Sequence, residues 1–338
     1  MDSLTIGQET LNEATQHLDS IRDFIRFGVT ALRSHEVHLG QGTEDFFAES
    51  AALVLQSLSL DWSADEQILD AKLLPSEKQR IAELLEKRIN QRIPLGYLLN
   101  LAYFAGQPYY VDERVLIPRS PVAELIENQF SPFFSNGLSR AQGGVNQLPH
   151  NDHPIEPTRM LDLCTGSACI AIALSFAFPD ASVDAIDLSR EALEVAAINV
   201  EHHSKEAQVS LIESNLLEKI PPQRQYDLII SNPPYVDAAD MADLPEEFLH
   251  EPEMALAAGR DGLDLVRHIL AQAADYLTDD GLLVVEVGNS EWALAQAFPK
   301  IKFHWLHFIR GGAGVFALTA KECRQHQAEF QQALGQQG

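Results

Sequence analysis

The residues best suited to chemistry lie in the stretch DLIISNPPYVDA, residues 227 to 238. Leu228 to Ser231 are apolar or small, as in a buried strand, and the strand must end at the two prolines because proline cannot donate to a sheet ladder. The tip of the strand then presents the side-chain amide of Asn232, a stiff backbone with outward carbonyls, and the ring of Tyr235. These groups are suited to gripping a planar group that bears an NH2.

Polar residues also follow the three strands predicted before this one. The first strand, RMLDLC, runs through the turn CTGSA into a helix, the second ends in AIDLS and the third in IESNLL. Ligands bind beyond the carboxyl ends of the strands in an open α/β sheet, so a site is expected at these turns. The candidate residues there are Asp162, Cys164, Thr165, Gly166, Ser167, Ala168, Asp187, Leu188, Asn215 and Leu216.

These strand-end residues together outline a nucleoside. Gly166 allows close backbone approach, and the amides at the start of the next helix favour an anionic group such as a carboxylate. Asp187 lies 187 − 162 = 25 residues after Asp162, where it can accept hydrogen bonds from both ribose hydroxyls, and Asn215 can meet an adenine edge. Two alternatives stay open: the glycine turn serves packing alone, or Asp187 caps the helix that begins near Ser189.

The periodicity of the chain predicts a helical region followed by an α/β domain, and its 338 residues are enough for both. In the helical region, Ser76 is expected to cap a helix that Pro94 stops. From residue 159 strands and helices alternate, which is typical of a parallel sheet covered on both faces, and the last two strands form an antiparallel edge hairpin. The expected divisions are a helical domain at 1–100, a β-hairpin and connecting segment at 101–130, a flexible linker at 131–158, the sheet domain at 159–320 and a frayed surface helix as the tail at 321–338.

The balance of acidic and basic residues indicates which class of partner the protein binds. The 49 acidic and 24 basic residues give a formal net charge of −25, which repels phosphate backbones, so a basic protein is the better partner, although acidity could also serve solubility alone. Three cysteines form no disulfide framework, and the first residues do not resemble a signal peptide, so we expect a cytoplasmic protein without a metal site. No apolar segment reaches the ~20 residues of a membrane-spanning helix.

The strand-end motifs LDLCTGSACIAIA, AIDLS and YDLIISNPPYVDA, together with EPEMALAAGRDGL and EVGNSE, resemble a known family. This family is the S-adenosylmethionine-dependent methyltransferases that modify the glutamine side-chain amide in proteins. Within that family the chain is most similar to the branch that acts on large-subunit ribosomal protein L-three. The resemblance extends to SEKQRIAELLEKRINQRIPLGYL and YYVDERVLIPRSP and so covers nearly the whole chain. It implies a Rossmann-like, seven-stranded class I methyltransferase domain, an N-terminal helical substrate-recognition domain, S-adenosylmethionine as cofactor, glutamine N5-methylation and a basic ribosomal protein as substrate.

The resemblance assigns catalysis to the motif Asn-Pro-Pro-Tyr, that is Asn232, Pro233, Pro234 and Tyr235. A carboxamide nitrogen is a poor nucleophile, so the enzyme must orient it; Asn232 Oδ1 and the Pro233 carbonyl are suited to accept one N–H each, and Tyr235 can pack on the planar amide. Asn232 also borders the expected cofactor site. The segment LIPRSP would close over the cofactor through Pro118 and Arg119, while a surface salt bridge remains the alternative for Arg119.

The sequence departs from the family pattern at three positions: Cys164 and Ala168 replace glycines of the first turn, and Asn215 replaces an acidic residue. Three other functions stay open. Release factors are the alternative protein substrate. Adenine N6-methylation of nucleic acid would use the same Asn-Pro-Pro-Tyr motif, called the clamp below. The acidic VDAADMADLPEEFLHEPE beside the motif argues against this function and against stable nucleic-acid binding. A non-catalytic ribosome-assembly factor is disfavoured because Asn232 and Asp187 are both present.

Overall fold

The computed structural model describes residues 4–43, 45–60, 65–134 and 148–335. The predicted linker at 131–158 therefore lies partly, at 135–147, outside the described residues. By its internal contacts the chain divides into two units. Unit 1 comprises Met1–Ala102, Val111–Glu113 and Pro245–Glu251, and unit 2 comprises Tyr103–Tyr110, Arg114–Leu244 and Pro252–Gly338. Within the described ranges, every helix is too short or too polar to cross a membrane.

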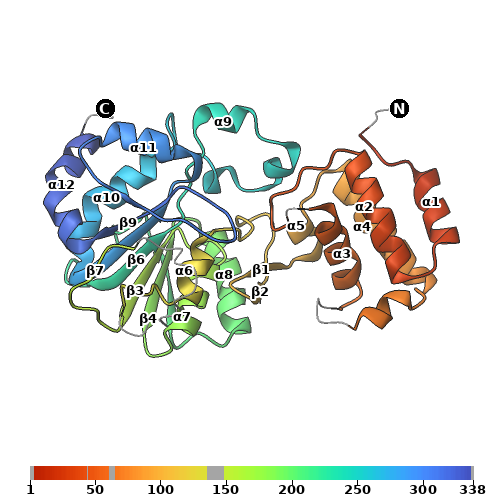
Figure 1. Ribbon diagram of the computed structural model, residues 1–338, viewed down its shortest axis with the longest axis horizontal. Coiled ribbons are helices and arrows are strands. Elements are labelled where there is room, and N and C mark those ends of the chain that lie inside the picture. Colours follow the sequence, from red (N-terminus) through yellow and green to blue (C-terminus); the bar gives the residue numbers. More distant parts are fainter. Residues whose placement is uncertain (1–3, 44, 61–64, 135–147, 336–338) are drawn as a thin grey trace. The chain divides into compact units, whose positions relative to one another are not determined.

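Unit 1 is helical (Figure 1), as the periodicity predicts. Its helices are α1 (Gln8–His17), α2 (Ile21–Ser34), α3 (Phe46–Ser57), η1 (Glu66–Asp70), α4 (Pro75–Asn90), α5 (Leu95–Leu99) and η2 (Glu246–His250). The predicted Ser76 cap is wrong, because α4 already begins at Pro75. Proline is favoured at the first helical position, where no N–H partner is needed, and Glu77 accepts the Leu74 N–H at 2.7 Å to complete this end of the helix.

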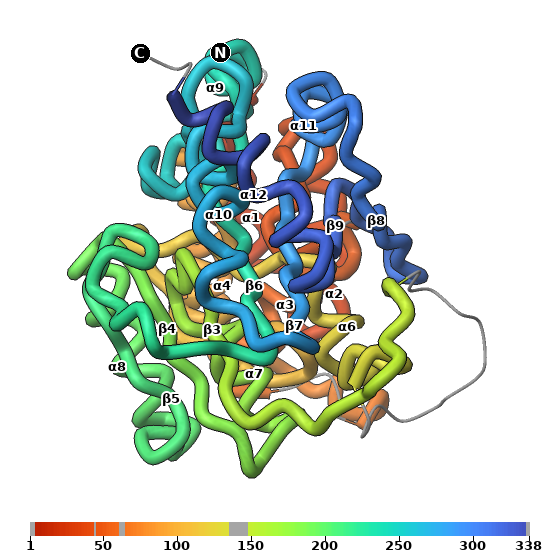
Figure 2. Tube along the Cα trace, turned by 90° about the vertical axis from the view of Figure 1, so that its left-hand side faces the viewer, coloured from red at the N-terminus to blue at the C-terminus, as the bar shows by residue number. Residues whose placement is uncertain are grey.

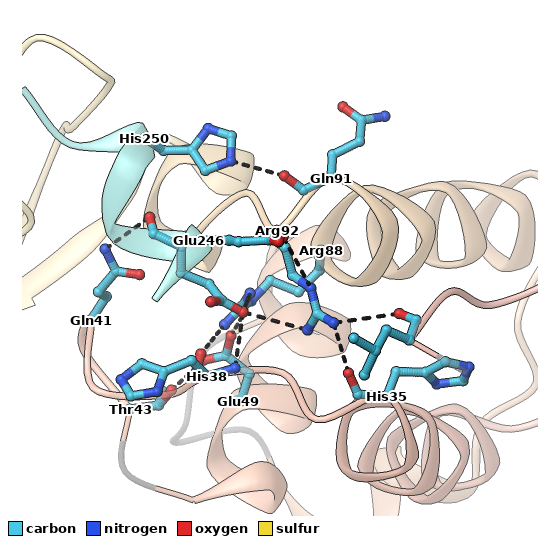
Figure 3. A network of polar contacts seen from close by, with 12 residues as sticks. His35, His38, Gln41, Thr43, Glu49, Arg88, Gln91, Arg92, Glu246 and His250 are labelled. Carbon is cyan, nitrogen blue, oxygen red and sulfur yellow. Dashed lines mark hydrogen bonds and ion pairs between the residues drawn. The ribbon is translucent and has the colours of Figure 1, made fainter. Parts of the chain in front are cut away.

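A buried polar network fixes the segment Pro245–Glu251 within unit 1 (Figure 3). Arg88 of α4 donates from Nε to Glu49 of α3 at 2.7 Å, and its Nη1 lies 3.5 Å from Oε1 of Glu247. The same Glu247 oxygen accepts the His38 backbone N–H at 2.9 Å. All three charged side chains are buried, so removal of one would leave a costly unpaired charge. An exchange of the helical unit must therefore include Pro245–Glu251, which lies inside the predicted 159–320 segment.

Unit 2 contains a seven-stranded sheet in the order β5-β4-β3-β6-β7-β9-β8. Five strands are parallel: β3 (Arg159–Leu163), β4 (Ser182–Asp187), β5 (Val209–Glu213), β6 (Tyr226–Ser231) and β7 (Leu277–Glu286). The edge is antiparallel and consists of β9 (Val315–Thr319) and β8 (His304–Trp305). The α/β fold with a parallel sheet and an antiparallel edge hairpin is thus confirmed. A separate two-stranded sheet is formed by β1 (Ala102–Phe104) and β2 (Gln107–Tyr109).

Helices cover both faces of the large sheet (Figure 1). Because successive strand residues point to opposite faces, Leu228 and Ile230 of β6 belong to one core while Ile229 belongs to the other. The first core includes residues of α6 (Val122–Glu127), α7 (Cys169–Ala177) and α8 (Arg190–His202). The second includes residues of α10 (Asp264–Tyr276), α11 (Glu291–Ala297) and α12 (Ala320–Leu334). Shorter elements follow β6 and β7, namely α9 (Ala238–Ala242), η3 (Glu253–Ala255) and η4 (Gly288–Ser290).

The C-terminal helix differs from the frayed surface helix that the sequence predicts. Helix α12 starts with a capping box in which Thr319 and Glu322 accept each other's backbone N–H groups. It lies alongside α10 (Figure 2), and its Cys323 and Phe330 are fully buried. The glutamine-rich composition hides these apolar residues, which make α12 part of the second core.

The burial of Phe330 leads to a test of stability. Phe330→Ala should lower the free energy of unfolding by about 3–5 kcal/mol, because the ring is removed from a packed core and leaves a cavity. Urea titration followed by circular dichroism measures this change. The exposed neighbour Gln331 provides the control, since Gln331→Ala should stay within about 0.5 kcal/mol of the parent chain. Equal stabilities for the two variants would contradict the packing of α12.

Candidate functional site

A pocket lies at the carboxyl ends of the parallel strands in unit 2. It is lined by residues of the turns that follow β3, β4, β5 and β6. The structure brings eleven of the thirteen predicted cofactor residues to its wall: Pro118, Arg119, Cys164, Thr165, Gly166, Ser167, Asp187, Leu188, Asn215, Leu216 and Asn232. Asp162 and Ala168 do not line it. Of the four predicted catalytic residues, Asn232 and Pro234 do.

The turn after β3 owes its shape to left-handed backbone conformations. Cys164, Gly166 and Ala168 have φ angles of 60°, 53° and 62°, a region that favours glycine, which is why glycines would suit these positions. Ala168 is fully buried and packs in the core with α7. The replacement of a glycine by Ala168 therefore adds a methyl group to the core and leaves the pocket wall unchanged.

Asp187 organises two backbone segments of the pocket wall. Its Oδ2 accepts the Gly166 N–H at 2.8 Å, and its Oδ1 accepts the Ser189 N–H at 2.9 Å. The alternative that Asp187 caps the following helix is wrong, because Ser189 is the N-cap of α8 and accepts the Ala192 N–H. Burial raises the pKa of the Asp187 carboxyl, while these backbone N–H groups oppose that shift. The carboxylate thus ties the turn after β3 to the end of β4.

Asp162 supports the same turn from behind the pocket. Its Oδ2 accepts the Thr165 hydroxyl at 2.5 Å and the Ala171 N–H at 3.2 Å. Its Oδ1 is buried and has no hydrogen-bond partner within the described part of the chain. Burial raises the pKa of Asp162 to about 7, although the two hydrogen bonds favour the ionised form. Asp162 is therefore a buried acid that shapes the loop.

The tip of β6 presents a buried amide oxygen. Ser231 fixes the last residue of the strand by donating its hydroxyl to the Leu163 carbonyl of β3 at 2.8 Å. Asn232 follows and lines the pocket, yet its Oδ1 is buried and, among the residues the structure describes, has no hydrogen-bond partner. Pro233 and Pro234 are buried and cannot move freely about φ. A buried acceptor atom thus lies at the wall of this pocket.

Tyr235 contacts three residues that lie at or after the end of β7. Its hydroxyl donates to Oε1 of Glu286 at 3.3 Å, and its carbonyl accepts the Ser290 hydroxyl at 2.9 Å. A Cβ atom added at Gly288 would lie only 2.4 Å from Cε2 of Tyr235, so the ring lies directly against this glycine. The sequence analysis missed Glu286 as a candidate, although an acidic residue in the apolar run LLVVEVG signals a buried charge that needs partners.

Asn215 and Arg119, two further predicted residues of the pocket, donate hydrogen bonds to residues nearby in the sequence. Asn215 donates its side-chain amide to Glu218 at 2.7 Å, which turns its carbonyl oxygen away from that bond and leaves it available as an acceptor. Arg119 donates to the Ile117 carbonyl at 3.3 Å, and its charge lowers the pKa of the buried Glu286, against the larger effect of burial. Arg119 thus lies in the pocket wall, close enough to Glu286 for its charge to act on that carboxyl.

The raised pKa of Asp162 predicts a pH-dependent stability. An unfolded aspartate ionises near pH 4 and the folded one near pH 7, so its contribution is fully present below about pH 4 and is lost as the pH rises through about 7. Asp162→Asn cannot ionise. The unfolding free energy of the parent chain minus that of Asp162→Asn should therefore fall between pH 4 and pH 7 in urea titrations. A difference that stays constant over this range would contradict the assignment.

Comparisons with known proteins agree with this architecture. Residues 145–262 match the family model of the methyltransferase small domain. The ribosomal protein uL3 glutamine methyltransferase of Francisella tularensis (strain SCHU S4) is 40% identical over 324 residues, covering 96% of this chain and 98% of that protein. The enzyme of the same name from Bordetella pertussis is 40% identical over 311 residues, 92% of this chain and 98% of that protein.

A solved structure described as a ribosomal protein L11 methylase from Lactobacillus delbrueckii subsp. bulgaricus shows a weaker likeness. It is 21% identical, covers 49% of this chain and 69% of that chain, and has a TM-score of 0.33, too low to support an inference. The two sequence relatives decide the matter, because each spans almost the whole of both chains at 40% identity. The chain belongs to the family of ribosomal protein uL3 glutamine methyltransferases.

Proposed function

We propose that the chain transfers a methyl group from S-adenosylmethionine to the side-chain amide nitrogen of a glutamine in ribosomal protein uL3. The observation that carries the proposal is the Oδ1 atom of Asn232, a buried acceptor at the pocket wall with no partner in the described parts of the chain. A buried acceptor normally has a hydrogen-bond donor, so a donor from outside the chain is expected here. The family supplies the identity of that donor, an amide NH2.

The residues of the pocket fit the proposed cofactor. Asp187 keeps lone pairs beyond the two backbone N–H groups it accepts, and these can receive the ribose hydroxyls. Leu188, which is 58% exposed, offers an apolar surface beside the predicted adenine position, and Asn215 offers an amide edge. The glycine turn at Gly166 allows the backbone to approach closely. When bound, S-adenosylmethionine supplies an electrophilic methyl group.

Asn232 and Pro233 would orient the acceptor. Asn232 Oδ1 accepts one N–H of the glutamine amide and the Pro233 carbonyl accepts the other, so the nitrogen lone pair is held toward the methyl donor. Positive charge develops on this nitrogen in the transition state, and both hydrogen bonds then strengthen. The methylated nitrogen becomes neutral again when it loses one of its two protons, which methylation has made acidic. Orientation of this kind can supply up to ~7–11 kcal/mol of the barrier reduction. The two prolines keep the acceptors in place without a reorganisation cost.

The charge of the chain supports a basic protein substrate. A net charge of −25 attracts the basic surface typical of ribosomal proteins and repels RNA phosphates. A glutamine in a flexible loop can reach Asn232 more readily than one in a helix or strand, because a loop can extend its side chain into the pocket. Unit 1 is the proposed substrate-recognition domain. A ribosomal protein acceptor would place the reaction in the cytoplasm.

Removal of the Asn232 amide tests the proposed chemistry. Asn232→Ala should lower the single-turnover rate of methyl transfer by about a hundredfold or more, because the lost hydrogen bond acts on the acceptor as charge develops. The affinity for S-adenosylhomocysteine, measured by calorimetry, should change much less. Asn128→Ala serves as the control, since the Asn128 amide donates to the Glu124 carbonyl and does not line the pocket. Near-parent turnover in Asn232→Ala would remove this residue from the mechanism.

A separate experiment identifies the substrate. The enzyme is incubated with methyl-labelled S-adenosylmethionine and, in parallel reactions, unmethylated uL3, a release factor or ribosomal RNA. Label should enter a glutamine of purified uL3 without RNA, and the rate at low substrate concentration should fall as salt rises, because attraction between opposite charges is screened. Preferential labelling of the release factor, or of adenine in RNA, would overturn the proposed substrate.

A further inference from the structure

The motif EVGNSE contains a buried carboxylate whose place in the reaction is unassigned. Glu286 is the last residue of β7, is only 5% exposed and lies next to β6 in the sheet. A carboxylate in such a position is costly unless its oxygens are hydrogen-bonded. The two groups that donate to Glu286 come from two different parts of the proposed site.

The first donor comes from the clamp and the second from the connecting segment. Tyr235 of the clamp donates its hydroxyl to Oε1 at 3.3 Å. Ser120 donates its hydroxyl to Oε2 at 2.5 Å, and Ser120 lines the pocket beside Pro118 and Arg119. One carboxylate therefore joins the wall of the cofactor pocket to the residue that ends the Asn-Pro-Pro-Tyr motif.

Two glycines show how closely this part of the site is packed. Gly288 follows Glu286 by two residues and lies against the Tyr235 ring. Gly314 lies against Gly288 in turn, since a Cβ atom on Gly314 would be 2.1 Å from the Gly288 carbonyl oxygen. Tyr235 therefore has little room to shift on this side, and its hydroxyl donates to Glu286.

We propose that Glu286 is a positioning residue for methyl transfer, which couples the cofactor-pocket segment at Ser120 to the acceptor clamp at Tyr235. This inference rests on the proposed function. Glu286 acts through its two donors and is not expected to touch either substrate. When Ser120 and Tyr235 are both bonded to the carboxylate, the pocket wall and the clamp hold the geometry that the transfer requires. Loss of either bond removes one of the two contacts that orient the carboxylate, so the remaining hydroxyl no longer has a fixed acceptor.

A double-mutant cycle tests the coupling between Ser120 and Tyr235. Ser120→Ala and Tyr235→Phe each remove one hydroxyl and should each lower the single-turnover rate about fivefold to tenfold, the effect of one hydrogen bond. The double variant should be about as slow as either single variant, because the two bonds act as one unit. In a Glu286→Gln background, which is itself about tenfold slower, adding either change should have little further effect. The KM for uL3 should stay within about threefold of the parent value throughout.

Asp184→Asn is the matched control. Asp184 is also a buried carboxylate that accepts a tyrosine hydroxyl, from Tyr226 at 2.7 Å, but it does not line the pocket. This variant should lower stability while the rate per folded molecule stays at the parent value. Independent, multiplicative effects of Ser120→Ala and Tyr235→Phe would overturn the proposal, as would a folded Glu286→Gln variant with the parent rate. Should Glu286→Gln fail to fold, the double variant still decides.

The parent chain separates this result from the proposed function. If the parent chain labels a glutamine of uL3 but the effects of Ser120→Ala and Tyr235→Phe are independent, only the proposed role of Glu286 is wrong. If the parent chain binds S-adenosylhomocysteine but labels no glutamine in uL3, the proposed function is wrong, and so is the role of Glu286 that rests on it.

Discussion

The proposed site depends on one atom, the Oδ1 oxygen of Asn232, which has no hydrogen-bond partner among the residues that the structure describes. A buried acceptor without a donor costs about 1–3 kcal/mol, so a fold keeps one only if something else holds it in place. Here the backbone on both sides of Asn232 is held in place. Ser231 is bonded to β3, and the two prolines restrict the backbone that follows. The stability of the sheet thus maintains a binding site for an external N–H group.

Three buried carboxylates also hold segments of the pocket wall in place. Asp162 braces the turn after β3, Asp187 joins that turn to β4, and Glu286 joins Ser120 to Tyr235. Burial raises the pKa of all three, which reflects the cost of holding acids away from water. Each acid accepts at least one hydrogen bond from a residue in a loop at the pocket. The acids therefore hold these connections together in the pocket wall.

Local sequence patterns predicted much of the fold and of the pocket. Alternating strands and helices predicted the order of elements. The rule that ligands bind at strand ends pointed to Asp187, Asn215 and Asn232, which line one pocket in the structure. Partners distant in sequence left no such signal. Ser120 and Glu286 are 166 residues apart, and Arg88 and Glu247 are 159 apart. Nothing in the local sequence distinguishes buried Glu247 from exposed Glu246, because only the tertiary fold brings Arg88 to one of them.

The central claim, that Asn232 receives an N–H of the substrate amide, is tested most directly by a crystal structure. The complex would contain the full chain, S-adenosylhomocysteine and a uL3 peptide with the target glutamine. The account predicts that Asn232 Oδ1 lies about 2.9 Å from the glutamine side-chain nitrogen. A glutamine nitrogen more than about 3.5 Å from this oxygen, with Asn232 paired to another group of the protein, would contradict it.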